Sequence, residues 1–489
     1  MPARSLALLG YAVRPRTVLK YFGFLCLSLA VMTAVPVGAA LVLGEPWLAL
    51  RYGVVTVAVG ALGAALARIE APNGIQVNEA LVVTALTIGA GALATSFPLM
   101  AEEPRFLDAL FESVSAVTTT GLSALATTAG KTHGFLFARA WTQWYGGLVI
   151  VVLALALVMA PGAAAKRLSG GEAEAEDVVA GTRVRARRVL GVYCGLTVAG
   201  VAVLWVSGAP IFEAVVHGLA AISTGGFSTT DTGPAEVAGW PFRAVLLLVC
   251  ILGSINFTLL WRAARGRPSA LFSDGEVRTL AAMCVLVSCL LALTMGLSGH
   301  RDWGKVAADA PFLAISAQTT TGFSTVPVQA LDPGSKLVLI LSMAVGGDMG
   351  STAGGMKIFR LLVVLKLLQH LFARTALTRH AVVEVRVANR PLDAPEIELA
   401  LIMVVLFVLL TVVSWLPFVI MGYDPLNALF EVVSALGTVG LSAGISGPDL
   451  APALKAVLCL DMLAGRLDIV AFLVLFYPPT WFGRRAGGS

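Results

Sequence analysis

Four short segments rich in threonine and glycine contain the residues best suited to bind an ion. They lie at 118–122, 223–227, 319–323 and 437–441. In each, a threonine stands two residues before a glycine that is followed by Leu or Phe and then Ser. One such segment is common at helix ends, but four matching segments indicate an internal repeat. The candidate ligands are Thr118, Thr119, Thr120, Gly121, Ser223, Thr224, Gly225, Gly226, Thr319, Thr320, Thr321, Gly322, Gly437, Thr438, Val439 and Gly440.

Glycine backbone and threonine hydroxyls can supply oxygen ligands to a dehydrated monovalent cation. Glycine adopts backbone angles that let successive carbonyl oxygens point the same way. Rings of such carbonyls replace the hydration shell of K+ in selective pores. No carboxylate lies within the four segments, which argues against a divalent cation. Four segments meeting at one axis would therefore form a filter for a monovalent cation. The alternative is that they are ordinary helix caps and small-residue packing sites.

A short, mostly apolar stretch leads into each segment and is too short to cross a bilayer. It begins thirteen residues before the glycine, at Asp108, Glu213, Asp309 and Asn427. Asp and Asn are favoured N-caps, and an acid suits the positive end of a helix. We therefore expect four re-entrant half-helices that begin at these residues and end at the Thr/Gly segments. Their negative ends would favour a cation at the axis.

The composition is that of a polytopic membrane protein. Apolar residues make up 57% of the 489 residues and charged residues only 13%, about half the usual charged share. This excludes a soluble enzyme, a disordered regulator and a nucleic-acid binder. A span needs about 20 mostly apolar residues. Ten candidate runs are present: 21–43, 52–67, 80–101, 140–165, 189–212, 244–261, 279–299 and 399–423 without charges, and two interrupted runs, one beginning at Lys336 and one from Ala456 to Gly483.

Basic residues predict the orientation, because Lys and Arg concentrate in cytoplasmic loops. With both termini in the cytoplasm, 24 of the 34 Lys and Arg lie on the inner side, nine lie outside, and Arg466 lies within a span. We expect a multi-pass protein of the inner cell membrane, in contact with the lipid bilayer. The expected fold is all-α, with four pseudo-symmetric repeats of span, pore helix, filter and span around one central pore. The expected divisions are an N-terminal two-span hairpin (1–74) and the four repeats (75–168, 169–268, 269–390 and 391–489).

The returning span of the third repeat contains a glycine-rich segment, 346–355. Each glycine in a helix costs about 1 kcal/mol against alanine, so the helix should break there. An irregular segment below the filter could obstruct the pore and move as a gate. The alternative is a kink that serves packing. The candidate gate residues are Gly346, Gly347, Asp348, Gly350, Ser351, Thr352, Gly354, Gly355 and Lys357.

Arg466 places a positive charge in the returning span of the fourth repeat. An ionisable residue at such depth is a functional hypothesis by default. If Arg466 faces the cavity, its charge repels cations and forms a barrier. The competing interpretation is a structural ion pair with Asp461, Asp468 or Asp348. Both interpretations, the barrier and the structural role, hold if the ion pair of Arg466 also fixes the glycine-rich loop.

The chain resembles the Trk/Ktr/HKT family of potassium transporters, and specifically its TrkH-type membrane subunit. The resemblance rests on the four Thr/Gly segments, on Gly350 to Lys357, which is similar to the family's GSTAGGIK, and on Met462 to Ile469, which is similar to MLLGRLEI. Trp144 to Gly147 and Gly253 to Phe257 are also similar to family segments. Two spans before the first repeat fit TrkH better than the shorter Ktr form.

This resemblance implies several properties. The fold would be a pseudo-fourfold pore in a homodimer, with 346–355 as an intramembrane gate and Arg466 beside it. The partner would be a ring of cytosolic, nucleotide-binding RCK-type (TrkA-like) subunits on a separate chain, and no nucleotide site is expected here. Glycine in all four repeats favours K+ over Na+. Asp348 and Met349 depart from the family, which more often has small residues there.

Three functions follow as hypotheses. The first is gated potassium uptake driven by the membrane potential, and the second is a Na+- or H+-coupled potassium symporter. The third is an integral-membrane enzyme that acts on lipid-linked substrates. Such an enzyme predicts a cluster of His, acids or a nucleophilic Ser at a membrane face. The five His residues occur in no such motif, and we expect no enzymatic activity.

Overall fold

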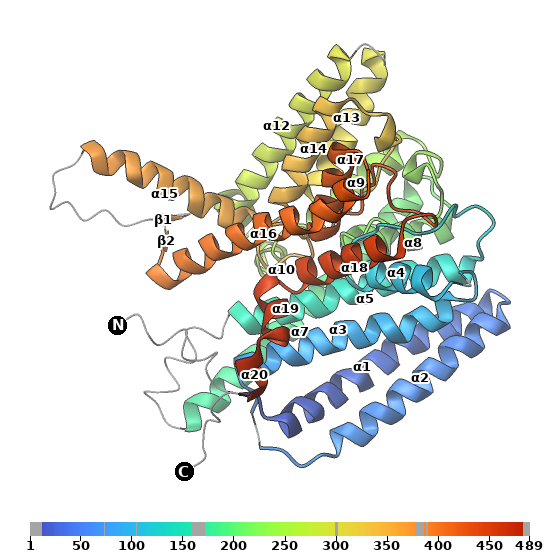
Figure 1. The fold of residues 1–489 in the computed structure, drawn as a ribbon, viewed down its shortest axis with the longest axis vertical. Helices are drawn as coiled ribbons and strands as arrows, with labels where there is room; N and C mark the ends of the chain where they lie inside the picture. The colour runs from blue at the N-terminus through green and yellow to red at the C-terminus, as the bar shows by residue number, and fades with distance from the viewer. Residues whose placement is uncertain are drawn as a thin grey trace.

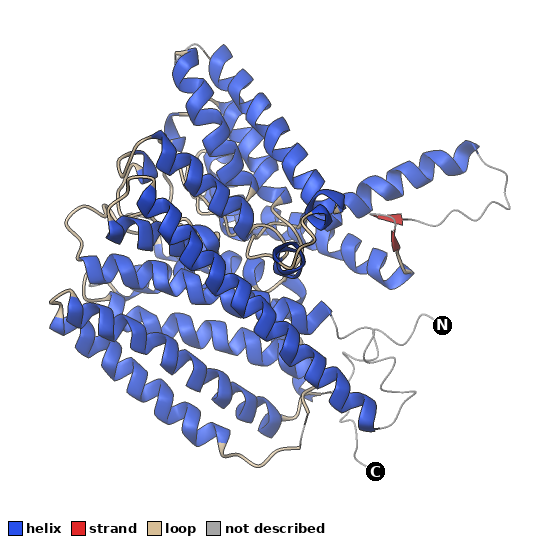
Figure 2. Ribbon diagram, turned by 180° about the vertical axis from the view of Figure 1, so that it is seen from behind, coloured by secondary structure: helices blue, strands red, loops and turns tan. Residues whose placement is uncertain are grey.

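The computed structural model describes residues 12–72, 74–103, 105–158, 172–298, 302–376, 386–387 and 390–482. These residues are almost entirely helical (Figures 1 and 2). Strands in the described part are limited to β1 (Arg386–Val387) and β2 (Arg390–Pro391), which pair antiparallel. The predicted all-α fold is therefore confirmed. The predicted division at 168/169 lies outside the described residues.

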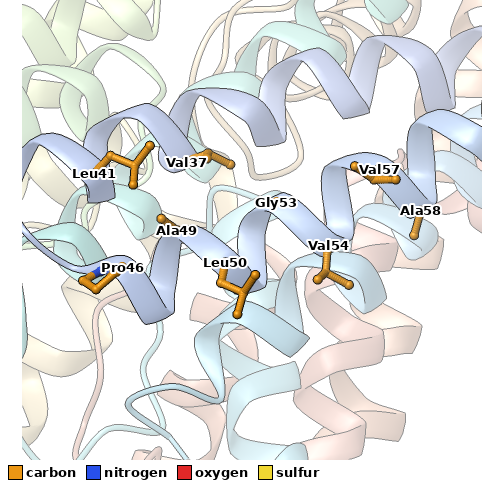
Figure 3. Close-up of a pocket in the computed structure, with 9 residues that line it drawn as sticks. All are labelled: Val37, Leu41, Pro46, Ala49, Leu50, Gly53, Val54, Val57 and Ala58. Carbon is orange, nitrogen blue, oxygen red and sulfur yellow. The ribbon is translucent and has the colours of Figure 1, made fainter.

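The N-terminal hairpin consists of α1 (Pro15–Val42) and α2 (Pro46–Ala67). The two helices approach closely at Gly23 and Gly63, where an added Cβ would overlap the opposite backbone. Small residues allow such close packing in membranes. An open groove of about 750 Å³ runs along this hairpin, and Figure 3 shows the side chains that line it. It is lined only by apolar residues: Val37, Leu41, Pro46, Ala49, Leu50, Gly53, Val54, Val57 and Ala58. A groove without oxygen ligands suits lipid and not a dehydrated cation.

Four repeats follow, each with an outward span, a short helix and a returning span. The outward spans are α3 (Val77–Leu99), α7 (Glu172–Val206), α12 (Gly275–Leu297) and α16 (Ala394–Ile420). The short helices are α4 (Phe106–Val117), α8 (Ile211–Ile222), α13 (Trp303–Gln318) and α17 (Pro425–Leu436). The returning spans begin with α5 (His133–Val158), α9 (Trp240–Gly253), α14 (Pro333–Val345) and α18 (Pro452–Arg466).

The remaining elements continue the returning spans or lie in loops. They are α10 (Phe257–Ala264), α11 (Ser269–Ser273), α15 (Ile358–Ala376), α19 (Ile469–Phe476), α20 (Pro478–Phe482), η2 (Gly233–Ala235) and η3 (Val328–Ala330). In Figures 1 and 2, α15 extends away from the other helices, and the β1–β2 hairpin connects it to the start of α16.

The predicted half-helices exist, but the prediction of where they begin was wrong. The N-caps are Arg105, Pro210, Asp302 and Asp424. Asp108, Glu213 and Asn427 are the third residues of their helices, and Asp309 lies in the middle of α13. In two repeats an aspartate further upstream caps the helix: Asp302 accepts a hydrogen bond from the Gly304 amide, and Asp424 from the Asn427 amide. The side chains of the predicted residues instead contact loops and neighbouring repeats: Asp108 contacts Lys455, Glu213 contacts Thr229, Asp309 contacts Thr325 and Asn427 contacts Lys336.

The predicted spans agree with the structure only in part. Six helices of the described chain are long and apolar enough to cross a membrane unbroken. The run 244–261, predicted as one span, is instead broken between α9 and α10, whose axes differ by 108°. The returning spans of repeats three and four also break, after Val345 and after Arg466. Three of the four returning spans are therefore bent or interrupted. The breaks lie beyond the Thr/Gly segments, on the side opposite the starts of the short helices.

Candidate ion pathway

The four short helices end in the same backbone conformation. The residue after each C-cap is a threonine in the left-handed region: φ is 52° at Thr119, 50° at Thr224, 54° at Thr320 and 48° at Thr438. Each of these amides donates to the carbonyl three residues earlier, and the next amide donates to the carbonyl five residues earlier. β-branched residues rarely adopt positive φ. Four occurrences at equivalent positions therefore mark a strained, repeated feature of the kind found at functional sites.

The Thr/Gly segments close into a ring. Gly121, Gly226, Gly322 and Gly440 have positive φ, and each faces a carbonyl oxygen of the next segment. An added Cβ would overlap the carbonyl oxygen of Gly225, Thr321, Val439 and Thr120, respectively. The contacts run from repeat one to two, two to three, three to four and four back to one. The candidate ligands named from the sequence therefore lie together around one axis, and only glycine fits at the four contact points.

The threonines at the inner end of the ring carry oxygens that are available to an ion. The Oγ1 atoms of Thr119 and Thr438 are buried and have no hydrogen-bond partner among the described residues. The equivalent Thr320 Oγ1 accepts a bond of 2.7 Å from the Gly354 amide, and Thr224 Oγ1 donates to the Ser223 carbonyl. Leaving a buried hydroxyl unpaired costs about 1–3 kcal/mol, which bound cations would offset.

Two glutamines that the sequence analysis missed hold parts of this site. Gln143 of α5 donates through Nε2 to the Gly225 carbonyl at 2.5 Å, and its Oε1 accepts from the Phe227 amide. Gln318, the last residue of α13, donates to the Gly346 carbonyl at 2.7 Å. A lone glutamine in an apolar helix carries no motif, so the only available signal was its polarity within a membrane span.

Residues 346–357, here called the crossing loop, lie directly against the inner ends of three repeats. Thr352 Oγ1 donates to the carbonyls of Ile222 and Gly253 in repeat two, at 3.0 and 2.8 Å. The Gly354 amide donates to Thr320 in repeat three, and the Gly355 amide donates to the Gly437 carbonyl in repeat four at 3.0 Å. The candidate gate residues are therefore placed beneath the ring and are bonded to it.

Arg466 also contacts the crossing loop. Its Nη1 donates to the Thr352 carbonyl at 2.7 Å, and its Nε and Nη2 have no partner among the described residues. The three carboxylates considered as its partners are engaged elsewhere: Asp468 pairs with Arg360, Asp461 accepts from Ser414, and Asp348 accepts from the Asn256 amide. In the described chain, the Arg466 side chain holds the loop by donating to the main-chain carbonyl of Thr352. It forms no ion pair there.

The first half of the crossing loop is fixed to the break in repeat two. The Asn256 amide donates to Asp348 Oδ2 at 3.0 Å, and the Asn256 side chain donates to the Met349 carbonyl at 2.7 Å. The Met349 amide donates to Glu276 at the start of α12. At the other end, Lys357 adopts a φ of 76° and its ammonium donates to the Ala353 carbonyl. The first half of the loop is therefore bonded to Asn256 and Glu276, and Lys357 closes its other end on the loop itself.

Basic residues near the start of the returning spans contact neighbouring quarters. Lys336 Nζ of α14 donates to Asn427 of the next short helix at 2.9 Å and to the Gln329 carbonyl of its own repeat. Arg139 of α5 is buried and pairs with Glu112 of its own repeat at 2.8 Å, and its guanidinium carbon lies 3.8 Å from the centre of the Phe227 ring in repeat two. The sequence analysis counted these residues only as outer-loop charges. A basic residue three positions after the first proline of a returning span occurs at Lys336 and also at Lys455, which pairs with Asp108 of repeat one. This spacing was the signal that could have found these two lysines.

Comparisons with known proteins decide the family. Residues 50–480 match the TrkH family, which is described as a cation transport protein. The chain belongs to the TrkH family. It is 31% identical over 481 residues to the Trk system potassium uptake protein TrkI of Halomonas elongata, which covers 95% of this chain and 96% of that protein. It is 30% identical over 389 residues to the Trk system potassium uptake protein TrkH of Escherichia coli, which covers 76% of this chain and 79% of that protein.

A solved structure supports the same assignment. The crystal structure of the potassium transporter TrkH from Vibrio parahaemolyticus is similar with a TM-score of 0.84 and 25% identity, over 96% of this chain and all of that chain (100%). TrkH-family proteins are transporters and not enzymes, which removes the hypothesis of a lipid-processing enzyme. The family resemblance read from the Thr/Gly segments and from Gly350 to Lys357 is therefore confirmed.

Proposed function

We propose that this TrkH-family chain carries potassium into the cell through a gated, channel-like pore. The observation that carries this proposal is the closed ring of glycine-to-carbonyl contacts between Gly121, Gly226, Gly322 and Gly440 and their neighbouring segments. The named relatives are potassium uptake proteins. The transported ion is K+, and main-chain oxygens at 118–121, 223–226, 319–322 and 437–440 replace its water.

The ring suits a monovalent cation for three reasons. Its oxygens are carbonyls and hydroxyls, which match the ligands of potassium filters. The C-terminal ends of four short helices meet there, and these ends carry partial negative charge. The unpaired hydroxyls of Thr119 and Thr438 offer further oxygens at the inner end. The segments contain no carboxylate, which a divalent cation prefers.

The crossing loop is the gate in this proposal. It is bonded to repeats two, three and four and to Arg466, and the ring above it joins all four repeats. Arg466 adds a positive charge beside the loop, which raises the barrier to a cation. Opening requires the loop to leave Thr320 and Gly437, so its bonds there set the closed state.

The experiment that tests this function is rubidium-86 uptake into proteoliposomes under an imposed membrane potential, with K+, Na+ and Cs+ as competitors. Uptake that follows the potassium gradient and potential alone supports the gated pore. Uptake that requires an inward Na+ or H+ gradient would replace it with the coupled symporter. Absence of saturable rubidium flux in correctly folded protein would contradict both.

Assembly and orientation belong to the same proposal. The chain acts as a homodimer in the inner membrane, with both termini in the cytoplasm and an RCK-type nucleotide-binding subunit on that side. The exposed apolar side chains of α15 (Leu365, Leu368, Leu371 and Phe372) support contact with a second copy. Molar mass in detergent tests the dimer, and protease access to an epitope tag at the C-terminus in sealed inside-out vesicles tests the orientation. A monomer, or protection of that tag in those vesicles, would contradict it.

A further inference from the structure

The corner where α7 meets α10 gathers arginines around one tryptophan. Arg188 Cζ lies 4.5 Å from the centre of the Trp261 ring, and Arg265 Cζ lies 5.4 Å from it. Arg262 and Arg267 are close in sequence, and all four arginines are exposed. None of the ion pairs formed by the described residues involves these four arginines. Within the described residues, the positive charge of the corner is therefore not neutralised by any ion pair.

The corner also lies where a membrane surface should pass. Because α10 is bent by 108° from α9, it runs across the inner end of that span instead of continuing it. Its buried side chains are Phe257 and Leu260, and Trp261 is a residue type that anchors at the headgroup level. Beyond it, the α11 side chain Phe272 is 77% exposed. This pattern of arginines with exposed aromatics is typical of interfacial helices.

We propose that this α7–α10 corner binds the phosphate of an anionic phospholipid headgroup. Guanidinium groups bind phosphate oxygens with two parallel hydrogen bonds, and stacking on Trp261 holds two of them ready to do so. Residues 257–273 contain three arginines and no acidic residue, so charge complementarity selects an anion. The exposed Phe272 and the in-plane direction of α10 favour a lipid over an acidic protein, because both place apolar surface beside the phosphate.

The site has a direct connection to the crossing loop. Asn256 is the N-cap of α10: its Oδ1 accepts from the Thr258 amide at 2.9 Å. The same residue donates to Asp348 and to the Met349 carbonyl. A lipid that fixes α10 therefore fixes the residue that holds the first half of the loop. Lipid binding at the corner should change the rate of ion flux without any contact to the ring.

Binding is tested on the purified full chain in neutral detergent, by native mass spectrometry with dioctanoyl phosphatidylglycerol as the probe. Dioctanoyl phosphatidylcholine and inorganic phosphate are the comparison arms. Each arginine near an anionic headgroup contributes about 1 kcal/mol, or roughly fivefold in affinity. Arg265→Gln should therefore weaken phosphatidylglycerol binding about fivefold, and Arg188→Gln/Arg262→Gln/Arg265→Gln should weaken it further. Lys366→Gln, which removes one exposed charge on α15, is the matched control and should change little.

Several results would overturn the proposal. These are equal binding of the two lipids, an equal effect of Lys366→Gln and Arg265→Gln, and displacement of the lipid by equimolar inorganic phosphate. A fourth is loss of RCK-type subunit binding in Arg265→Gln with lipid binding intact, since the partner would then be a protein. Rubidium flux in phosphatidylcholine vesicles with and without phosphatidylglycerol tests the connection to the loop, and wild type should respond more than Arg265→Gln. Because lipid binding is measured without flux, failure of the site and failure of the proposed pore remain distinguishable.

Discussion

Lys455 Nζ lies 2.5 Å from Asp108 Oδ1, so the returning span of the fourth repeat is joined to the short helix of the first. Both side chains are buried, with 4% and 3% of their surface exposed. Lys455 also donates to the Pro448 carbonyl in its own repeat. The first and last quarters of the chain are therefore linked at the start of α4 by a buried, hydrogen-bonded ion pair.

Breaking this pair should destabilise the protein strongly. Removing one partner of a buried ion pair costs about 3–5 kcal/mol because the other charge stays buried and unpaired. We expect Lys455→Met to lower the thermal unfolding midpoint in detergent, and Lys455→Met/Asp108→Leu to recover part of the loss. Lys131→Met is the control: its pair with Glu103 is 2.8 Å long but more exposed, at 17% and 15%, and should contribute under about 1 kcal/mol. Equal losses in the two single variants would contradict the prediction.

Serine at Gly322 or Gly121 should admit sodium. The new Cβ would overlap the carbonyl oxygen of Val439 or of Gly225, which pushes these oxygens from the positions that suit K+. We expect the sodium-to-potassium permeability ratio to rise about tenfold, which corresponds to about 1.4 kcal/mol. The ratio is measured from reversal potentials or from sodium competition with rubidium.

Gly447→Ser is the control for this pair of variants. Nothing lies within 4 Å of a Cβ added at Gly447, so the ratio should not change. Unchanged ratios in both Gly322→Ser and Gly121→Ser would remove the filter assignment.

A side chain at Gly354 should weaken the closed crossing loop. An added Cβ would overlap the Gly437 carbonyl oxygen and Thr438 Oγ1, so the loop could no longer lie against repeat four. We expect Gly354→Ala to raise basal rubidium flux in the absence of any regulatory subunit, about tenfold for each 1.4 kcal/mol lost from the closed state. Gly89→Ala, with nothing within 4 Å, should leave flux unchanged. Reduced flux in folded Gly354→Ala would argue against a gate there.

Replacing Arg466 separates its charge from its hydrogen bond. Arg466→Ala removes both and should raise flux by releasing the Thr352 carbonyl and lowering the electrostatic barrier. Arg466→Lys keeps the charge and should retain low flux. Rubidium flux over a range of imposed potentials is the measurement, with folding checked by size-exclusion chromatography. If Arg466→Lys conducts as much as Arg466→Ala, the charge is not the barrier.

The sequence predicted the ring well because its signal is repeated four times. The Thr and Gly positions recur in every repeat, and the positive φ values of Thr119 and Gly121 recur with them. The start of each short helix was harder to predict. Several polar residues precede each one, and the cap is decided by which side chain reaches the first amides, as Asp424 does for the Asn427 amide.

The break between α9 and α10 was missed because the run 244–261 contains no charge. The turn residues Gly253, Ser254 and Asn256 are present in the sequence, but the long charge-free run around them favours a single unbroken span. The contact partners of Gln143, Lys336 and Lys455 could not be predicted from the sequence. Each joins residues far apart in sequence, and such pairings appear only once the repeats are arranged in space.

The closure of the ring has a consequence for how the four quarters can diverge. Each glycine faces an oxygen that belongs to the neighbouring quarter. The width of the opening inside the ring, here called the bore, therefore depends on all four quarters together. Sequence drift in spans and outer loops leaves that bore intact, whereas bulk added at a single contact displaces both adjoining quarters. An internally duplicated protein of this kind can thus lose its fourfold likeness almost everywhere and still conserve one aperture.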